Sequence, residues 1–457
     1  MPKNSCISPY PFFKLYEDKK VVIKKQEIVM KHFVYSLITL LQVGFLCNAA
    51  QVGFNKTGYV LTEGNANFFR YYEVTVDLQG RIIAVGRTNN PVDGLIACYL
   101  PNGILDRTFN GTGFINEEDD HNDSRIYYAV TVDSQGRIIA VGQTDALDGL
   151  IVRYLANGTL DTTFNGTGFI NQEDNNNDSQ VYLAVAIDLQ GRIIAVGQTD
   201  ANNGFNALIA CYLPNGILDK TFNETGFINE EDNDNDSRIY YGVTVDSQGR
   251  IIAVGQTDPN KGLIVRYLAD GTLDTTFNQT GFIKEGNTDF KVYYGVTVDS
   301  QGRIIVVGQT DANKGLIVRY LADGTLDTIF NQTGFIKEGG TDSNFYYRVS
   351  VDLQDRIIAV GQTDANRGLI VRYLANGTLD TTLNQTGFIK RETDFKIYNG
   401  VTIDSEGRII AVGQTDANKG LIARFLSNGV LDAESNWNLQ NFRESKNINK
   451  VSIGLLG

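Results

Sequence analysis

Three acidic runs contain the residues whose types and spacing could do chemistry. The runs are NEEDDHNDS at 116–124, NQEDNNNDS at 171–179 and NEEDNDNDS at 229–237 of the 457-residue chain. Dense negative charge attracts cations and basic partners. We therefore expect a binding rim formed by Glu117, Glu118, Asp119, Asp120, Asp123, Glu173, Asp174, Asp178, Glu230 and Glu231.

The third run could also hold a metal ion. Asp232, Asp234 and Asp236 alternate as D-x-D-x-D, which can place three carboxylate oxygens around one Ca²⁺. The EF-hand pattern also needs Gly at the sixth place and Glu at the twelfth. Ser237 stands at the sixth place, and the twelfth has no Glu. Two interpretations stay open, a calcium site and a solvated acidic loop, and the sequence implies no other cofactor.

The composition excludes some functions and leaves others open. A net charge of −13 argues against nucleic-acid binding, because phosphates are bound by Lys and Arg. Beyond residue 50 the only histidine is His121, and the sequence contains no G-x-S-x-G, H-E-x-x-H or phosphate-loop motif. Carboxylates are abundant enough for a glycosidase-like pair, but no pair differs from the repeating background. We assign no catalytic residue.

The elements that would position these acidic runs repeat along the chain. The phrase D-x-x-G-R recurs, with one variant in which Asp355 replaces Gly, and its Arg residues are between 52 and 58 residues apart. A catalytic site is normally singular, so a device present in every unit is expected to be structural. Asp can accept hydrogen bonds from a tight turn, Gly can take a positive φ, and Arg can pair with Asp. The copies are Asp77–Arg81, Asp133–Arg137, Asp188–Arg192, Asp246–Arg250, Asp299–Arg303, Asp352–Arg356 and Asp404–Arg408.

Each unit predicts four short strands joined by Asn-, Asp- and Gly-rich turns, with no sustained helical periodicity. Seven such units favour an all-β fold, a seven-bladed β-propeller of four-stranded antiparallel blades. The last unit lacks the segment FNQTGFI, whereas FNKTGYV occurs at Phe54–Val60. We therefore expect the N-terminal strand to complete the last blade and close the ring.

A tyrosine recurs in the first strand of each unit, which is nearest the channel in a propeller. Two interpretations are open: aromatic wedges between blades, or a ring lining a ligand funnel. The acidic runs and the TDANKG turns should share one face, and the D-x-x-G-R turns and NGTLD links the other. The tyrosines are Tyr71, Tyr127, Tyr182, Tyr240, Tyr293, Tyr346 and Tyr398.

The unit GRIIAVGQT followed by GLIVRYLANGTLDTTFNGTGF resembles the delta-60 repeat, a bacterial repeat family. The resemblance extends from about Phe54 to Asp432. It implies an extracytoplasmic propeller and no particular reaction. The sequence departs from the repeat at Cys98 and Cys211, which replace the strand Arg, at Leu383, which replaces Phe, and at Asp355.

The ends of the chain predict its organisation. MKHFVYSLITLLQVGFLCNAA at 30–50 has the pattern of a secretory signal, with cleavage near Ala49 and translation starting at Met30 or Met1. We expect an extension and signal at 1–50, a propeller at 51–432 and a tail at 433–457. Cys98 and Cys211 should be free thiols in a half-buried strand.

We expect a secreted or cell-surface, monomeric binding scaffold without a membrane span, whose acidic rim recognises a protein or glycan. The alternative is a polysaccharide hydrolase or lyase with its site in the central funnel. An enzyme should have one pocket in which unlike residues from different blades converge, whereas a binding module should have near-equal blades.

Overall fold

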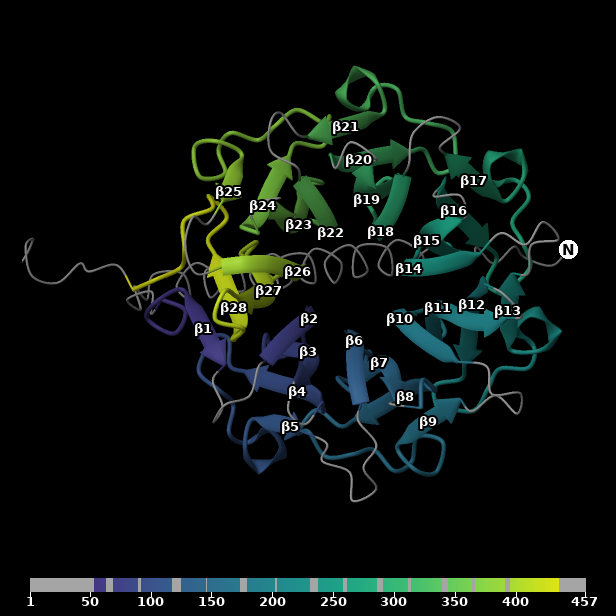
Figure 1. Cartoon of the computed structure of the whole chain (residues 1–457), viewed down its shortest axis with the longest axis horizontal. Coiled ribbons are helices and arrows are strands. Elements are labelled where there is room, and N and C mark those ends of the chain that lie inside the picture. Colours follow the sequence, from purple (N-terminus) through teal and green to yellow (C-terminus); the bar gives the residue numbers. More distant parts are fainter. Residues whose placement is uncertain are drawn as a thin grey trace, which may run out of the picture. The chain divides into compact units, whose positions relative to one another are not determined.

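The computed structural model describes residues 53–434, except for short gaps at 63–68, 89–91, 117–124, 145, 173–178, 202–203, 231–236, 258–260, 286–290, 311–313, 339–343, 364–365 and 391–394. In this part the chain forms seven four-stranded antiparallel sheets arranged as the blades of a propeller (Figure 1). The predicted fold is therefore confirmed. The predicted signal at 30–50 and the tail beyond 434 lie outside the described residues.

The first four blades follow one another along the chain. Blade 1 contains β2 Phe69–Val76, β3 Ile82–Thr88, β4 Gly94–Tyr99 and β5 Phe114–Asn116. Blade 2 contains β6 Arg125–Val132, β7 Ile138–Thr144, β8 Gly149–Tyr154 and β9 Phe169–Gln172. Blade 3 contains β10 Gln180–Ile187, β11 Ile193–Ala201, β12 Gly204–Tyr212 and β13 Phe227–Glu230. Blade 4 contains β14 Arg238–Val245, β15 Ile251–Thr257, β16 Lys261–Tyr267 and β17 Phe282–Glu285.

The remaining blades complete the ring. Blade 5 contains β18 Lys291–Val298, β19 Ile304–Thr310, β20 Gly315–Tyr320 and β21 Phe335–Glu338. Blade 6 contains β22 Asn344–Val351, β23 Ile357–Thr363, β24 Gly368–Tyr373 and β25 Phe388–Lys390. Blade 7 contains β26 Phe395–Ile403, β27 Ile409–Thr415, β28 Gly420–Phe425 and the N-terminal β1 Tyr59–Thr62. Short 3₁₀ turns occur at η1 Phe109–Gly111, η2 Phe222–Glu224, η3 Phe277–Gln279 and η4 Phe330–Gln332.

The N-terminal strand closes the ring as predicted. β1 pairs antiparallel with β28, so the purple and yellow ends of the described chain lie side by side (Figure 1). The amide of Phe54 donates to the carbonyl of Asp432 at 2.7 Å. The Thr62 hydroxyl lies 2.8 Å from the hydroxyl of Tyr71 in blade 1. The N-terminal segment therefore completes blade 7 and also contacts blade 1.

Burial explains why the blades need one another. The second and third strands are buried on both faces, with near-continuous runs such as IIAVG and GLIVRY. The hydrophobic clusters each combine residues of two neighbouring blades. A four-stranded sheet alone could not cover both faces. The core therefore consists of layers between blades, and the innermost strands β2, β6, β10, β14, β18, β22 and β26 surround the channel (Figure 1).

Candidate binding site in the central channel

The D-x-x-G-R phrase forms a structural turn. In blade 1 the backbone amides of Gln79 and Arg81 donate to Asp77 Oδ1 at 2.9 and 2.8 Å. Arg81 Nε lies 2.7 Å from Asp77 Oδ2. Gly80 has φ of +76°, where a side chain is strained. Asp355 takes the same left-handed conformation with φ of +56°. The predicted structural role of the phrase is confirmed.

A second Arg–Asp pair links each blade to the next. In blade 4, Arg266 Nε donates to Asp274 Oδ2 at 2.8 Å, and both side chains are almost fully buried. A terminal nitrogen of Arg266 donates to the carbonyl of Ala322 in blade 5. Arg153, Arg319, Arg372 and Arg424 bridge their junctions in the same way, and the last of these reaches Pro101 of blade 1. We call these contacts the interblade staples.

The two cysteine blades make the staple with a different arginine. Cys211 stands where other blades have the staple Arg, and Arg192 of the D-x-x-G-R phrase extends to Asp219 at 2.9 Å. Arg192 also donates to the carbonyl of Ala269 in blade 4. Arg81 does the same beside Cys98. All seven junctions therefore keep one guanidinium that donates to the next blade.

Both cysteines are free and fully buried, which corrects the expected half-buried setting. Burial raises the pKa of the Cys98 and Cys211 thiols to about 12. A thiol needs its thiolate form to act as a nucleophile or metal ligand. These two therefore act as small core residues.

The predicted tyrosine ring forms wedges between blades and does not line a funnel. Tyr127 has no exposed surface, and its ring fills the space over Gly94 of blade 1. A Cβ on Gly94 would come within 2.5 Å of that ring. Tyr293 covers Gly262 at the blade 4–5 junction in the same way. Of the two open interpretations, the wedge is confirmed and the funnel lining is wrong.

The residue that follows each wedge tyrosine faces the channel instead. The register of each innermost strand shifts there, for example between Tyr71 and Glu73, so the strand bulges at Tyr72. A bulge inserts one extra residue and re-aims its side chain. Five bulge residues are tyrosines, whereas blade 3 has Leu183 and blade 7 has Asn399. The five are Tyr72, Tyr128, Tyr241, Tyr294 and Tyr347.

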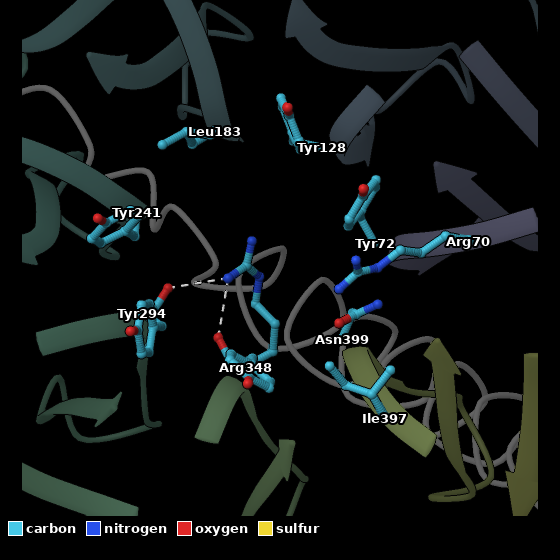
Figure 2. Close-up of a pocket in the computed structure, with 10 residues that line it drawn as sticks. Arg70, Tyr72, Tyr128, Leu183, Tyr241, Tyr294, Arg348, Ile397 and Asn399 are labelled. Atoms are coloured by element: carbon cyan, nitrogen blue, oxygen red, sulfur yellow. Dashed lines mark hydrogen bonds between the residues drawn. The ribbon is translucent and has the colours of Figure 1, made fainter. Parts of the chain in front are cut away.

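These bulge residues line a cavity of about 230 Å³ in the channel (Figure 2). Neighbouring rings pack against each other, with centroids 5.4 Å apart for Tyr72 and Tyr128 and 5.7 Å apart for Tyr294 and Tyr347. Besides the seven bulge residues, the lining contains Arg70, Arg348 and Ile397. Side chains from all seven blades therefore meet at this cavity.

An ion pair in the channel joins blade 6 to blade 1 past the innermost strand of blade 7. Arg348 Nε of blade 6 lies 2.6 Å from Glu73 Oε2 of blade 1, and the side chains are 23% and 15% exposed. The blade between them has Gly400, whose Cβ would lie 2.8 Å from Glu73 Oε1. Other blades have Ala or Gly at the position of Glu73 and Arg348, as at Ala129. This pair is therefore a departure from the repeat, and Gly400 leaves room for it.

The guanidinium of Arg348 extends towards the middle of the cavity (Figure 2). One terminal nitrogen donates to the carbonyls of Tyr294 and Tyr347 at 3.1 and 3.0 Å. The pair with Glu73 uses Nε. The second terminal nitrogen has no protein acceptor among the described residues. It is available to a ligand in the cavity.

Arg70 is a second departure at the same site. Blades 2, 4 and 7 have Ile at this position, whereas Arg70 places a guanidinium 5.0 Å from the centre of the Tyr72 ring. Its Nε is buried without a hydrogen-bond acceptor in the described part of the chain. The amide of Asn399 donates to the carbonyl of Tyr71 at 2.7 Å, which fixes its side chain beside Arg70 (Figure 2).

Burial sets the protonation of this site. It raises the pKa of Glu73 above its ordinary value, although Arg348 opposes the rise. It also raises the pKa of Tyr128, Tyr241, Tyr294 and Tyr347. The phenol groups are therefore neutral at pH 7 and can donate hydrogen bonds. The cavity combines neutral aromatic walls with two guanidinium groups.

The predicted rim lies almost entirely outside the described residues. This holds for Glu117, Glu118, Asp119, Asp120, Asp123, Glu173, Asp174, Asp178, Glu231 and the calcium candidates Asp232, Asp234 and Asp236. Glu230 is described, and it is internally paired: Arg238 lies 2.7 Å away and the Tyr267 hydroxyl donates to it. Within the described ranges, no group of three or more His, Cys, Asp or Glu side chains could hold a metal ion.

A larger cavity of about 320 Å³ lies at the outer part of blades 4 and 5. Its lining includes Glu285, which is already paired with Lys291 at 2.6 Å and with the Tyr320 hydroxyl at 2.6 Å. The segment FIKE that contains Glu285 recurs in blade 5. This cavity therefore consists of repeated, paired residues, unlike the channel.

Sequence reasoning missed Arg70, Glu73, Arg348 and Asn399. The available signal was their departure from the repeat inside the innermost strands, together with the doublet Tyr-Tyr in five units. Two consecutive side chains cannot face the same side of a regular strand. The doublet was therefore a signal that one tyrosine wedges between blades and the other faces the channel.

One family of repeats, described as a β-propeller, matches the chain. The family described as "Domain of unknown function (DUF5122) beta-propeller" matches six segments, at 80–109, 134–164, 191–222, 247–277, 300–330 and 355–383. No curated protein matches the chain. Among the 382 residues from 53 to 434, the described ones include no helix long and apolar enough to cross a membrane.

Solved structures that resemble the chain share little sequence with it. The WD40 beta propeller domain of Doa1 is 15% identical with a TM-score of 0.45, over 80% of this chain and 97% of that one. Drosophila Semaphorin 2a is 11% identical with a TM-score of 0.48, over 80% and 75%. The extracellular domain of the putative one component system BT4673 from B. thetaiotaomicron is 12% identical with a TM-score of 0.43, over 81% of this chain and 40% of its own length. The repeated segments and the seven closed blades together identify the chain as a β-propeller repeat protein.

Proposed function

We propose that this protein is an extracytoplasmic binding scaffold that recognises a glycan or a protein. One observation carries the proposal: residues that depart from the repeat converge on the channel cavity, whereas the repeated polar residues are used in turns and staples. Aromatic rings with a few convergent polar groups are typical of recognition sites.

The location of the cavity supports recognition on one face. Arg70 and Ile397 lie near the beginning of β2 and β26, the ends at which the links from the preceding blades arrive. By topology, the acidic runs are among those links. The charge of the runs and the signal-like segment at 30–50 motivate the extracytoplasmic rim-binding part of the proposal, as does the resemblance to the delta-60 repeat.

The alternative is a polysaccharide hydrolase or lyase in the channel, which the convergence of unlike residues from different blades would by itself favour. Such an enzyme would need a group that accepts a proton near neutral pH. Burial raises the pKa of the channel tyrosines, which disfavours the phenolate, and Glu73 is held by Arg348. These observations favour binding over turnover.

Electrophoresis of the full chain through gels that contain polygalacturonate or a neutral glucan tests the proposal. We expect retardation by the acidic polysaccharide and no release of new chain ends when the protein and the polysaccharide are incubated together. Release of chain ends would overturn the binding role. A parallel run with chelator tests calcium, and loss of retardation in that run would show that an ion holds the binding surface together.

A further inference from the structure

The most specific departure from the repeat is the cationic, aromatic cavity in the channel. We infer that it binds a sugar acid, a pyranose ring with a carboxylate, either alone or at the end of a glycan. This inference deepens the proposed binding function and rests on it. It is carried by charge, by the shape of the walls and by size.

Charge selects the carboxylate. Arg70 and Arg348 are the charged residues among those that line the cavity. Arg348 is matched by Glu73, whereas Arg70 has no carboxylate partner among the described residues. An Arg guanidinium binds a carboxylate through two parallel hydrogen bonds. A cavity with excess positive charge in a chain of net charge −13 favours an anionic ligand.

The walls select a ring. The tyrosines present flat apolar faces around the channel, with hydroxyl groups at their edges (Figure 2). A pyranose has an apolar C–H face for such rings and hydroxyl groups for polar partners, here Asn399 and the phenols. A short aliphatic acid would cover little of these walls. The tyrosines around the channel therefore favour a sugar acid over an acidic side chain of a peptide.

Size limits the ligand to one residue. The cavity has a volume of about 230 Å³. Pockets for drug-sized ligands are larger, at about 300–1,000 Å³. Below the channel cavity, a second cavity of about 160 Å³ shares Tyr294 and Arg348 with the first. The Arg348–Glu73 pair lies where the two cavities meet, so a ligand that enters beside Arg70 meets this pair at the bottom of the first cavity.

The test is calorimetric titration of the full chain with four probes: galacturonate, glucuronate, galactose and glutarate. We expect one of the two sugar acids to bind at least about tenfold more tightly than galactose, which lacks the carboxylate for Arg70, and than glutarate, which lacks a ring to cover the tyrosines. Arg70→Ile, which installs the residue of blades 2, 4 and 7, should weaken this binding at least about tenfold.

Arg107→Thr is the matched control. It removes one exposed positive charge from the same blade, in a link between the third and fourth strands, and it installs the residue found in blade 2 at Thr162. We expect it to bind like the unaltered chain. Because Arg70→Ile and Arg107→Thr both install residues that other blades already have, both should fold.

The outcomes separate this inference from the proposed function. No binding of either sugar acid, or binding that Arg70→Ile leaves unchanged, would overturn the channel site. Equally tight binding of glutarate would overturn the inference that the site recognises a sugar ring, because it would show that the carboxylate alone accounts for the affinity. Breakdown of polygalacturonate that depends on Arg70 would keep the channel site and overturn the proposed binding role.

Discussion

Two Arg–carboxylate pairs of this protein have similar distances and different settings: the staple pair is fully buried, and the channel pair is partly buried. In the staple, Arg266 meets Asp274 at 2.8 Å within blade 4 and also donates to Ala322 of blade 5, and an Arg–Asp contact of this kind recurs around the ring. In the channel, Arg348 meets Glu73 at 2.6 Å, once. Repetition marks the first pair as scaffold. The second occurs where the repeat is broken.

The carboxyl pKa values of the two pairs shift in opposite directions. Burial raises the pKa of Asp274, but hydrogen bonds from Thr276 and the charge of Arg266 outweigh this and hold the pKa below its ordinary value. Burial also raises the pKa of Glu73, and there Arg348 does not compensate for it. The staple therefore stabilises its charges, whereas the channel pair retains a desolvation cost. Such costs are typical of functional sites.

The largest effect should come from breaking a staple. Arg266→Ala removes the partner of the buried Asp274 and the donor to Ala322 of the next blade. Loss of one partner of a buried pair costs about 3–5 kcal/mol. We expect a loss of this size in the free energy of unfolding, measured by denaturant titration.

Glu406→Gln is the control for that measurement. Glu406 is 60% exposed in its pair with Arg408, and Gln occupies this place in the other six blades. Exposed pairs contribute about 0–1 kcal/mol. If Arg266→Ala costs no more than Glu406→Gln, the staples do not hold the blades together.

A smaller loss should follow from crowding a wedge tyrosine. In Gly262→Ala the new Cβ would lie 2.5 Å from the ring of Tyr293 in the next blade. Overpacking of this kind costs about 1–3 kcal/mol. Thermal unfolding should show a lower Tm than for Gly111→Ala, whose Cβ would meet nothing within 4 Å and whose cost comes from its φ of +73° alone. A loss at Gly262 no larger than the loss at Gly111 would mean that contact with the Tyr293 ring costs no more than an unfavourable φ.

Removal of the channel pair should cost little. The double variant Glu73→Ala/Arg348→Ala installs the residue of blades 2 and 3 at both places. Removal of both partners leaves no unpaired charge in the partly buried channel, so little stability should be lost. We expect an unfolding free energy equal to or above that of the unaltered chain, and a loss comparable to that of Arg266→Ala would make the pair part of the scaffold.

The smallest effect should appear in the pH dependence of stability. Because the pKa of Asp274 is lowered by folding, its contribution is present above the unfolded value of about 3.9 and is lost as the pH falls through the folded pKa. Because the pKa of Glu73 is raised, its contribution falls as the pH rises above about 4.3.

Glu73→Gln separates the two contributions. Denaturant titrations between pH 2 and pH 7 should show that this variant loses as much unfolding free energy at acid pH as the unaltered chain. Above about pH 4.3 its unfolding free energy should depend less on pH. An unchanged profile above that pH would mean that Glu73 keeps its ordinary pKa in the folded protein.

The fold could be predicted because repetition makes local signals redundant. Seven copies of a turn phrase gave the number of blades, and the unmatched segment at Phe54–Val60 gave the closing strand. The recurrence of Tyr127 left two roles open, a wedge or a funnel lining, and its burial against Gly94 decides for the wedge. The boundaries at 50 and 433 stay predictions.

The site could not be predicted because it depends on backbone irregularity. A period of two predicts which side chains share a face, but the bulge at Tyr72 shifts that period by one residue. The pair between Glu73 and Arg348 joins strands far apart in the sequence, across a blade whose Gly400 leaves room for it. Sequence spacing contains no signal for such a crossing. The observable signal was that Glu73 and Arg348 stand where the other blades have Ala or Gly.

One measurement tests the central claim that repeated residues build the ring and departing residues bind. The Glu73→Ala/Arg348→Ala variant is titrated with the sugar acid that binds the unaltered chain, and the same sample is then unfolded with denaturant. We predict unchanged or higher stability together with at least about tenfold weaker binding. Unchanged binding at unchanged stability would contradict the account.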